Sequence, residues 1–582
     1  MIKLFKNFTK KDIVHILICV SLIVLQVALE LRMPDYMSEI TRLVQTEGSA
    51  MSDIIMQGVY MLLCAFGSLV AACIVGYFAT SVSSNFSATL RKLLFNKVGS
   101  FGMEEIKDFR TSSLITRTTN DVMQIEMFVG VALQMIVKAP IMAVWAILKI
   151  LNKGFEWSIL TACCVVVLLT TVAFLIMTVM PRFALVQKLI DKINAVTREH
   201  ITGIRVIRAF NAEKYQAGRF EETNNELTNT QLFNQRCFAI LHPMMNLVMH
   251  ALTIGIYLIG TNLIEKALIA DKIELFSNMV VFSSYGMQVI SSFLMLAMIF
   301  MILPRANISA RRIKEVLETE EMIIEGSFDG NTKEKGTVEF KNVSFKYPDA
   351  DEYLLKNISF KVKQGETIAF IGSTGSGKST LINLVPRFYD VTEGEILVDG
   401  VNVKEYTEEA LNNKIGYVSQ KAFMFTGSVK ENVGYGKCLH EITDEDIEEA
   451  IEVAQAKEFV EKMEDKCDSH IARGGTNVSG GQKQRLSIAR AIAKKPEIYI
   501  FDDTFSALDY KTDSVLRSKL KKYTKDATSL IVAQRIGTIM DADTIVVLED
   551  GECVGIGTHK ELLKKCEVYK EIALSQLSEE EL

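Results

Sequence analysis

The sequence has no cysteines at the C-x-x-C spacing and no excess of basic residues. Its ten cysteines are scattered along the chain, and Cys163 and Cys164 lie inside an apolar run. We therefore expect a reduced chain without disulfide bonds. The 582 residues carry a formal net charge of −6, which argues against nucleic acid as the main partner.

Charge is also scarce over long stretches of the first half, where apolar residues are concentrated. Up to about residue 304 the chain contains six apolar stretches long enough to span a bilayer, and the remainder is typical of soluble α/β sequence. The first stretch is too long for a signal-peptide core and has no convincing small-residue cleavage site, so we expect it to stay in the mature protein. The expected spans are residues 13–33, 56–78, 129–150, 157–180, 238–263 and 278–303.

Proline is absent between Met56 and Ser100, which predicts one helix that continues well past the second span. Such a helix is roughly 65 Å long, about twice the hydrocarbon thickness of a bilayer. The sequence after Pro181 and the polar stretch before residue 238 also favour long helical extensions. Helices of this kind can transmit motion from a cytoplasmic domain to the bilayer, although spacing alone also allows amphipathic surface helices.

Lysine and arginine indicate the orientation of the spans. They are frequent before the first span and after the second and fourth, whereas the loop after the first span has only Arg42 among acidic residues. The positive-inside rule then places both termini and the two long loops in the cytoplasm. We expect a multi-pass protein of the cell membrane whose second half is cytoplasmic. The basic residues before the first span are Lys3, Lys6, Lys10 and Lys11, and the acidic residues after it are Asp35, Glu39, Glu47 and Asp53.

Ionisable residues inside the expected spans are few, and the main ones are Lys138, His242 and His250. An intramembrane ionisable residue is by default a candidate for substrate contact. Lys138 also has a simpler interpretation, because its ammonium group can snorkel towards a polar boundary. The lack of charge from Asn278 to Pro304 favours an apolar or amphiphilic cargo without identifying it.

The run Gly372-Ser-Thr-Gly-Ser-Gly-Lys-Ser-Thr380 fits the pattern G-x-x-x-x-G-K-[ST], and strand-like residues 367–371 lead into it. A strand, a glycine-rich turn and a helix start form a nest of backbone N–H groups for polyphosphate. Lys378 is then expected to reach the β- and γ-phosphates and Ser379 to ligate Mg²⁺. The preceding strand argues against a chance glycine loop, so the chain is predicted to bind ATP or a close relative. The expected contacts are Ser373, Thr374, Gly375, Ser376, Gly377, Lys378, Ser379 and Thr380.

A second anion-binding helix start is predicted within Asn477–Arg490, where a serine and two glycines precede a helix-forming run. One domain has no use for two such nests unless the second serves an ATP held by another subunit. Because the chain contains both this run and the P-loop, it resembles the ATP-binding cassette (ABC) transporters, specifically half-size exporters with six spans and one nucleotide-binding domain. The signature sequence here is Val478-Ser-Gly-Gly-Gln482, with valine where the family usually has leucine.

The resemblance covers essentially the whole chain and implies its fold and domains. These are an α-helical membrane domain of six transmembrane helices with long cytoplasmic extensions (residues 1–314), a polar linker (315–336), and an α/β P-loop ATPase domain of the ABC type (337–582). The resemblance also implies two short coupling helices in the inner loops, near Thr111–Leu114 and near Ile207–Ala212.

The resemblance implies ATP and Mg²⁺ as cofactors and gives roles to further residues. Tyr347, an aromatic at a strand end that packing alone can also explain, looks like the residue that stacks on adenine. Gln420 and Asp502 look like Mg²⁺ contacts that complement Ser379, and Asp509 lies in the loop that crosses to the partner domain. The residues expected to face the partner's ATP are Val478, Ser479, Gly480, Gly481 and Gln482.

Two positions depart from the family's pattern. Asp503 stands where the family's catalytic general base is glutamate, and Gln534 stands where the family has histidine. The shorter side chain withdraws the carboxylate by roughly 1–1.5 Å, and a misplacement of about 1 Å can cost on the order of 10²-fold in rate. Glutamine can donate a hydrogen bond but cannot be protonated. We therefore predict a site that binds ATP well and hydrolyses it slowly.

The signature is intact, so it is expected to serve a competent P-loop on a second half-transporter chain. The sequence thus favours one subunit of a heterodimeric exporter, whereas a homodimer would own two impaired sites. The expected cargo is an amphiphile (drug-like, lipid or peptide) moved out across the cytoplasmic membrane. Two alternatives stay open: an ATP-gated regulatory subunit, and an exporter-like fold used for uptake.

Overall fold

The chain divides into two compact units. The computed structural model describes residues 3–46, 48–151, 154–438 and 440–577. One unit comprises Met1–Gly99 and Arg110–Thr319, and the other comprises Ser100–Phe109 and Glu320–Leu582. Residues 100–109, which a single division near 314 would leave in the membrane domain, group instead with the ATPase unit. Most of the expected linker, from residue 320 onward, groups with the ATPase unit as well.

Within the described residues, six helices are long and apolar enough to cross a membrane, and each contains one of the expected spans. The six-span prediction is therefore confirmed. The second helix runs for 49 residues, as the lack of proline predicts. These helices are α1 (Lys10–Gln45), α2 (Met51–Gly99), α5 (Val122–Leu151), α6 (Phe155–Thr202), α8 (Glu213–Lys266) and α9 (Ile269–Glu318).

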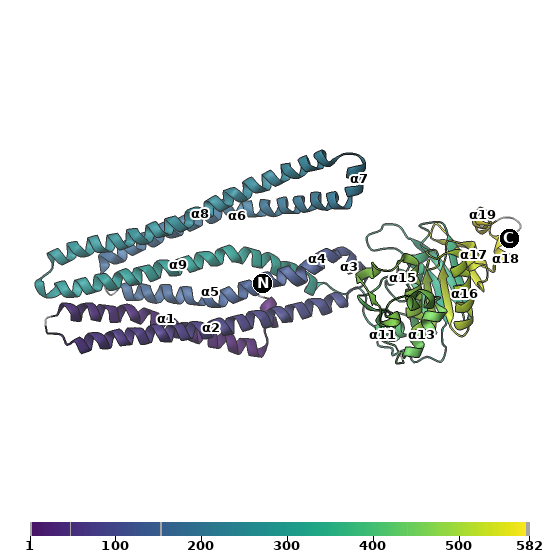
Figure 1. Cartoon of the computed structure of the whole chain (residues 1–582), viewed down its shortest axis with the longest axis horizontal. Helices are drawn as coiled ribbons and strands as arrows, with labels where there is room; N and C mark the ends of the chain where they lie inside the picture. The colour runs from purple at the N-terminus through teal and green to yellow at the C-terminus, as the bar shows by residue number, and fades with distance from the viewer. Residues whose placement is uncertain (1–2, 47, 152–153, 439, 578–582) are drawn as a thin grey trace. The chain divides into compact units, whose positions relative to one another are not determined.

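The long helices of the membrane unit pack mainly as three pairs: α1 with α2, α5 with α9, and α6 with α8 (Figure 1). Large side chains connect the pairs. The ring centroid of the buried Trp157 of α6 lies 5.5 Å from that of Phe282 in α9, while its Nε1 donates within its own pair, to the Ile256 carbonyl of α8 at 3.2 Å. Tyr285 of α9 reaches α1 instead, because its hydroxyl donates to the Leu31 carbonyl at 2.9 Å.

Short helices connect the long ones in the inner loops. α4 (Thr111–Thr116) continues through a π-helical stretch (Arg117–Asp121) into α5, and α7 (Ile204–Ala209) joins α6 to α8. The expected position of the first coupling helix, near Thr111–Leu114, is wrong. The helix that groups with the ATPase unit is α3 (Met103–Phe109), because its residues pack there, whereas α4 groups with the long helices.

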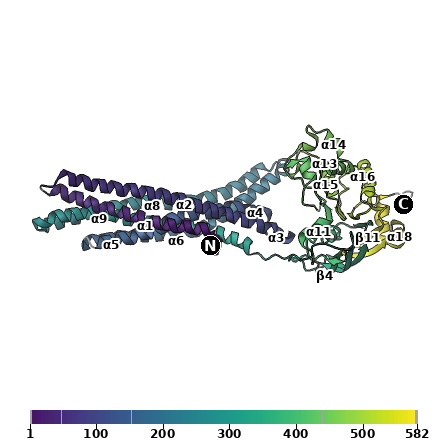
Figure 2. The ribbon, with the colours of Figure 1, turned by 90° about the horizontal axis from the view of Figure 1, so that it is seen from below.

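The ATPase unit is built on a six-stranded sheet with strand order β12-β11-β3-β10-β9-β6. All neighbours in it are parallel except the β11–β12 pair. Helices α13 (Asp444–Val453), α14 (Lys457–Glu461) and α15 (Gly480–Ala493) gather on one side of this unit, and β4 (Glu393–Val398) lies on the other (Figure 2). The sheet strands are β3 (Thr367–Gly372), β6 (Ile415–Val418), β9 (Ile498–Asp502), β10 (Thr528–Val532), β11 (Thr544–Glu549) and β12 (Glu552–Gly557).

A second, antiparallel sheet has the order β2-β1-β4-β5. It contains β1 (Val338–Phe345), β2 (Leu355–Val362) and β5 (Val401–Asn402) besides β4. Phe340 of β1 stacks on Phe360 of β2, with ring centroids 4.5 Å apart, inside the core that the two sheets share. The P-loop strand β3 belongs to the same core, so the nucleotide-binding turn begins from a fully packed base.

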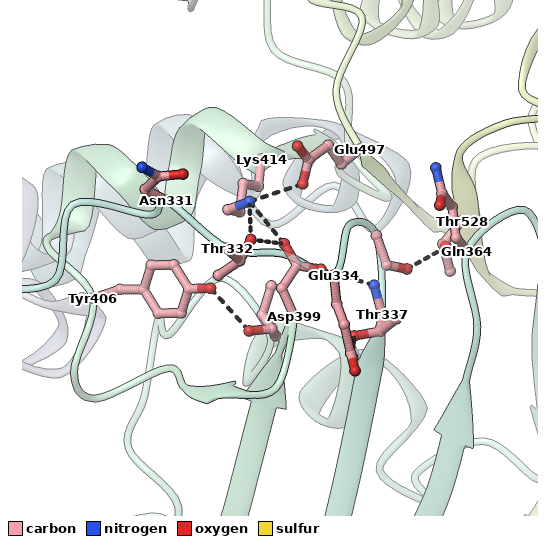
Figure 3. A network of polar contacts seen from close by, with 12 residues as sticks. Asn331, Thr332, Glu334, Thr337, Gln364, Asp399, Tyr406, Lys414, Glu497 and Thr528 are labelled. Atoms are coloured by element: carbon pink, nitrogen blue, oxygen red, sulfur yellow. Dashed lines mark hydrogen bonds and ion pairs between the residues drawn. The ribbon is translucent and has the colours of Figure 1, made fainter.

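A buried lysine fixes the polar stretch before β1 to the ATPase core (Figure 3). The Lys414 ammonium donates to Asp399 at 2.7 Å, to Glu497 at 2.9 Å and to the Thr332 hydroxyl at 3.3 Å. The other oxygen of the Asp399 carboxylate accepts from the Thr337 backbone N–H at 2.9 Å. A buried charge is tolerated only when it is paired in this way. The stretch expected to be a linker is therefore an ordered part of the ATPase unit.

Candidate nucleotide-binding site

The P-loop joins the end of β3 to α10 (Lys378–Asn383). Gly375 and Gly377 adopt φ values of 91° and 90°, a left-handed conformation that glycine enters without steric cost. A Cβ at Gly377 would also lie 2.6 Å from a methyl carbon of the buried Leu355, so that side chain would have to shift. The turn can therefore present successive backbone N–H groups to an anion.

Lys378 lies over this loop. Its Nζ donates to the carbonyls of Ser373 at 2.7 Å and Gly372 at 3.0 Å, and to the Ser376 hydroxyl at 3.3 Å. Burial lowers the pKa of the ammonium group below its usual range, while Asp503 and Asp502 oppose that effect. Ser376 is buried, so its side chain positions the lysine, whereas Ser373, Thr374 and Gly375 are exposed.

The first oxygen ligands expected for Mg²⁺ are brought together at the end of β9. The Ser379 hydroxyl donates to Oδ1 of Asp502 at 2.6 Å. Burial raises the pKa of the Asp502 carboxyl, and the hydrogen bond from Ser379 opposes this rise. A hydroxyl and a carboxylate are ligands that Mg²⁺ accepts, and this ion usually completes its shell with water and phosphate oxygens. The donor set therefore fits Mg²⁺.

Asp503 lies between two glutamines. Its Oδ2 accepts from Nε2 of Gln420 at 3.0 Å and from Nε2 of Gln534 at 2.8 Å. The residue is only 6% exposed, and its backbone adopts φ 45°, a conformation that aspartate tolerates better than most residues. The Asp503 N–H donates to the Val532 carbonyl at 3.1 Å, which connects the turn after β9 to β10. The two positions that depart from the family's pattern are thus in direct contact.

Tyr347 lies beside the P-loop helix. Its hydroxyl is 3.0 Å from the hydroxyl of Thr380, and its ring packs edge-on against Phe345 and Tyr389. The residue is half-buried. Both of its possible roles, stacking on a base and packing against other rings, are compatible with this position.

The signature residues form the start of α15. Ser479 is its N-cap, accepting from the Gln482 N–H at 3.3 Å, while the Gln482 side chain accepts from the Ser479 N–H at 2.8 Å. Ser479 and Gly480 are exposed, Gly481 is half-buried, and Val478 is buried in the core. A capped helix start with exposed small residues can bind an anion supplied from outside the chain.

Two further residues complete this region. Asp509 caps α16 (Tyr510–Tyr523), because its side chain accepts from the Thr512 N–H at 2.9 Å. The sequence reasoning missed Gln484, which is buried and donates to the Ser419 carbonyl at 3.1 Å. This bond connects the signature helix to the residue before Gln420. The sequence offers one sign of this role, a second glutamine two positions after Gln482, but it does not show which group that glutamine contacts.

The ionisable residues expected in the spans, Lys138, His242 and His250, leave out Glu30. Glu30 of α1 lies within the first span and pairs with Lys138 of α5 at 2.9 Å. The same oxygen accepts from Gln26 at 2.8 Å and from Ser68 of α2 at 3.1 Å. The structure therefore pairs Lys138 with an acid in a neighbouring helix. His242 and His250 are both exposed on α8.

The six apolar helices and the P-loop sheet define an ATP-hydrolysing membrane transporter. The ABC transporter model matches residues 355–506, and the ABC transporter transmembrane region model matches residues 16–293. An uncharacterized ABC transporter ATP-binding protein of Mycobacterium tuberculosis is 36% identical over 559 residues, covering 93% of each chain. The chain belongs to the ABC transporter family. It is a multi-pass membrane protein with a cytoplasmic ATPase domain.

Two further similarities are to a flippase and to an exporter. The ATP-dependent lipid A-core flippase of Aliivibrio fischeri is 30% identical over 532 residues, covering 90% of this chain and 89% of the flippase. The structure of a bacterial Atm1-family ABC exporter with ATP bound superposes with a TM-score of 0.83 at 22% identity, covering 97% of this chain and 98% of that one. The expected fold class, that of a half-size exporter with a helical membrane domain before the ATPase domain, is confirmed.

Proposed function

We propose that this chain is one subunit of a heterodimeric ABC exporter and that its own ATP site binds nucleotide but hydrolyses it slowly. The observation that carries the proposal is the contact of Asp503 with both Gln420 and Gln534 at 3.0 and 2.8 Å. One oxygen of the carboxylate that would receive a proton from water already accepts two amide hydrogens. The residue is also only 6% exposed, which restricts the approach of water.

ATP binding at this site uses the P-loop. The N–H groups of the loop and the Lys378 ammonium hold the phosphates by charge-assisted hydrogen bonds. To do this Lys378 exchanges its bonds to the Gly372 and Ser373 carbonyls for phosphate oxygens. Tyr347 offers an aromatic face to the adenine. Ser379, Asp502 and the side-chain oxygen of Gln420 would hold Mg²⁺, which neutralises charge on the β- and γ-phosphates.

Hydrolysis needs a base within hydrogen-bond reach of the attacking water. Asp503 is one methylene shorter than the family's glutamate, and both of its amide partners hold it at the end of β9. Gln534 can donate to a γ-phosphate but cannot take up a proton. Nucleotide bound here would therefore persist over many cycles and hold the two ATPase domains together on one side.

The signature of this chain serves the other site. Ser479 and Gly480 are exposed at a capped helix start, where the Ser479 hydroxyl and the Gly480 N–H can stabilise a γ-phosphate held by the partner. A partner with glutamate and histidine at the positions of Asp503 and Gln534 would then turn over at a normal rate. A homodimer would join two slow sites, which makes it the weaker candidate.

The proposed cargo is an amphiphile, drug-like, lipid or peptide. Residues 278–303 of α9 carry no charged side chain, which suits contact with an apolar part of a cargo. The similarity to a lipid A-core flippase, a protein named for a lipid, agrees with this class. An ATP-gated regulatory subunit or an uptake system would share the same nucleotide site, so transport itself has to be measured.

The test is to isolate the complex through a tag on this chain and to identify any stoichiometric partner. We expect a second half-transporter with glutamate after its Mg²⁺-linked aspartate, and ATP-dependent outward movement of a fluorescent amphiphile in reconstituted vesicles. A complex containing only this chain with full ATPase activity would overturn the heterodimer. Conformational cycling without net movement would favour the regulatory alternative, and inward accumulation would favour uptake.

A further inference from the structure

A cavity of about 290 Å³ lies inside the ATPase unit, between α3 and the segments that follow β1 and α10. α3 forms one wall, and Met322 and Ile323 lie beside it. Phe345, Phe388 and Tyr389 contribute the aromatic part of the lining. Clefts that bind small molecules begin near this size and are mostly apolar with a few polar groups. Nothing in the nucleotide chemistry described above uses this space.

Two carboxylates on α3 line the cavity, and neither forms an ion pair with a basic side chain in the part of the chain that the structure describes. Oε1 of Glu105 accepts from the Met322 N–H at 2.8 Å, and Glu105 is only 3% exposed. Its Oε2 is buried and, among the described residues, has no hydrogen-bond partner. Glu104 is half-buried, and burial together with Asp108, Glu105 and Asp349 raises its pKa. A buried carboxylate oxygen without a partner is costly, and a bound cation would remove that cost.

The basic residues nearby are engaged elsewhere. Lys107 of α3 pairs with Asp349 at 2.7 Å. The Lys346 ammonium lies 5.8 Å from the Tyr353 ring centroid. Arg387 pairs with Asp390 at 2.8 Å. These contacts leave Glu104 and Glu105 without an ion pair among the described residues, although Lys107 opposes the rise of the Glu104 pKa and Lys346 lines the same cavity.

The aromatic residues of the lining suit the same kind of ligand. The Phe345 and Tyr389 ring centroids are 5.8 Å apart with their planes inclined at 54°. Rings at such angles can present faces and edges around one centre, and aromatic faces attract ammonium groups. Carboxylates together with aromatic rings are the combination that recognises alkylated ammonium ions.

We propose that the cavity between α3 and the Phe345–Tyr389 wall binds a small hydrophobic organic cation. The site is separate from the P-loop, and the inference does not depend on the heterodimer or on slow hydrolysis. Its ligand contacts α3 on one side and, on the other, the two residues whose rings pack against Tyr347. An ammonium ion bound here would hold α3 against the part of the ATPase unit that faces adenine, and so would change ATP turnover.

The test uses photolabelling of the full-length chain in lipid nanodiscs with 4-azidobenzyltrimethylammonium. We expect saturable labelling of peptides containing residues 102–105 and 388–392. Glu105→Gln should weaken labelling by about tenfold, because it keeps an acceptor for the Met322 N–H while removing the charge. Asp526→Asn, at an exposed position of the ATPase unit outside the cavity lining, is the control and should label as the unaltered chain does.

The neutral isostere 1-azido-4-neopentylbenzene has the shape of the cation without its charge. It therefore distinguishes recognition of the charge from simple partition of the probe into an apolar cavity. We expect it to label these peptides at least tenfold less well than the cation. Equal labelling by both probes, or labelling confined to the membrane helices, would overturn the proposal. Complete protection by Mg·ATP would also overturn it, because the cavity would then belong to the nucleotide site. An effect of the cation on ATPase rate that vanishes in Glu105→Gln would confirm the coupling through α3.

Discussion

Gln534 donates a hydrogen bond from Nε2 to Oδ2 of Asp503 at 2.8 Å. The two residues that differ from the family's pattern are therefore one connected unit. Gln420 donates to the same oxygen at 3.0 Å, so two side chains from separate segments share the Asp503 carboxylate. Residues in direct contact have non-additive effects on activity. Changes at Asp503 and Gln534 should accordingly be judged together.

Restoring the family's residues at both positions should accelerate hydrolysis at this site. The double change Asp503→Glu with Gln534→His lengthens the carboxylate side chain and supplies a group that can be protonated, and we expect a ~10- to 100-fold higher rate at this site. The rate is measured as phosphate release from the complex with the partner's site inactivated. On a logarithmic scale, either single change alone should give much less than half of the rate increase of the double variant. No acceleration in the double variant would show that reach and protonation do not limit this site.

A negative charge at the signature should stop turnover at the partner's site. Ser479→Asp keeps a side chain that can cap α15, so the helix start is preserved while a carboxylate approaches the γ-phosphate. We expect steady-state ATPase activity of the complex to fall by more than tenfold. Thr443→Asp, at the capped start of α13, is the control and should leave activity unchanged. Near-normal turnover of Ser479→Asp would rule out the shared-site geometry.

The Glu30–Lys138 pair should contribute to the stability of the membrane unit. Glu30→Gln or Lys138→Met leaves one partner without its counter-charge, and each should destabilise the unit by about 1–3 kcal/mol. The exchange Glu30→Lys with Lys138→Glu should recover part of that loss. Denaturation in detergent measures the change. The exposed pair Lys192–Glu226, with side chains 56% and 53% exposed, serves as the control, and its exchange should have little effect. A variant with both Glu30→Gln and Lys138→Met whose loss of stability equals the sum of the two single losses would contradict a direct interaction.

Acidification should loosen the C-terminal helices of the ATPase unit through His559. Its Nδ1 lies 2.7 Å from the Tyr569 hydroxyl, its Nε2 is buried, and burial lowers the pKa of the ring. Below the ordinary histidine pKa of about 6.5 the unfolded state binds more protons than the folded state, so stability falls as pH falls. We expect a loss of about 1 kcal/mol between pH 7 and 5.5.

Hydrogen exchange over residues 559–569 measures this loss. His559→Gln should flatten the pH dependence, whereas His470→Gln, at an exposed position, should not. Equal pH dependence in both variants and in the unaltered chain would show that another group is responsible.

Features of the fold that depend on local pattern could be predicted from the sequence. The spans follow from runs of apolar residues, the length of α2 follows from the absence of proline, and the turn before α10 follows from its glycines. Contacts between distant segments could not be predicted in this way. The bonds from Gln420 and Gln534 to Asp503 join three loops that only the sheet order brings together.

Two misses have the same origin. The Glu30–Lys138 pair joins residues 108 positions apart, and an apolar run gives no sign of which helix supplies the counter-charge. The contacts that join α3 to the ATPase unit include the Glu105–Met322 bond, which crosses 217 positions. The family resemblance implied a short helix in this loop but did not show which residues group with the ATPase unit.

The central claim is that Asp503 is not the base that drives turnover. Phosphate release from the purified complex carrying Asp503→Ala tests it most directly, with nucleotide binding to this chain's site verified in the same preparation. The account predicts that the variant keeps most of the steady-state ATPase activity, because the partner's site performs the hydrolysis that limits the cycle. Loss of nearly all phosphate release, with ATP still bound, would contradict the account and would assign catalysis to Asp503.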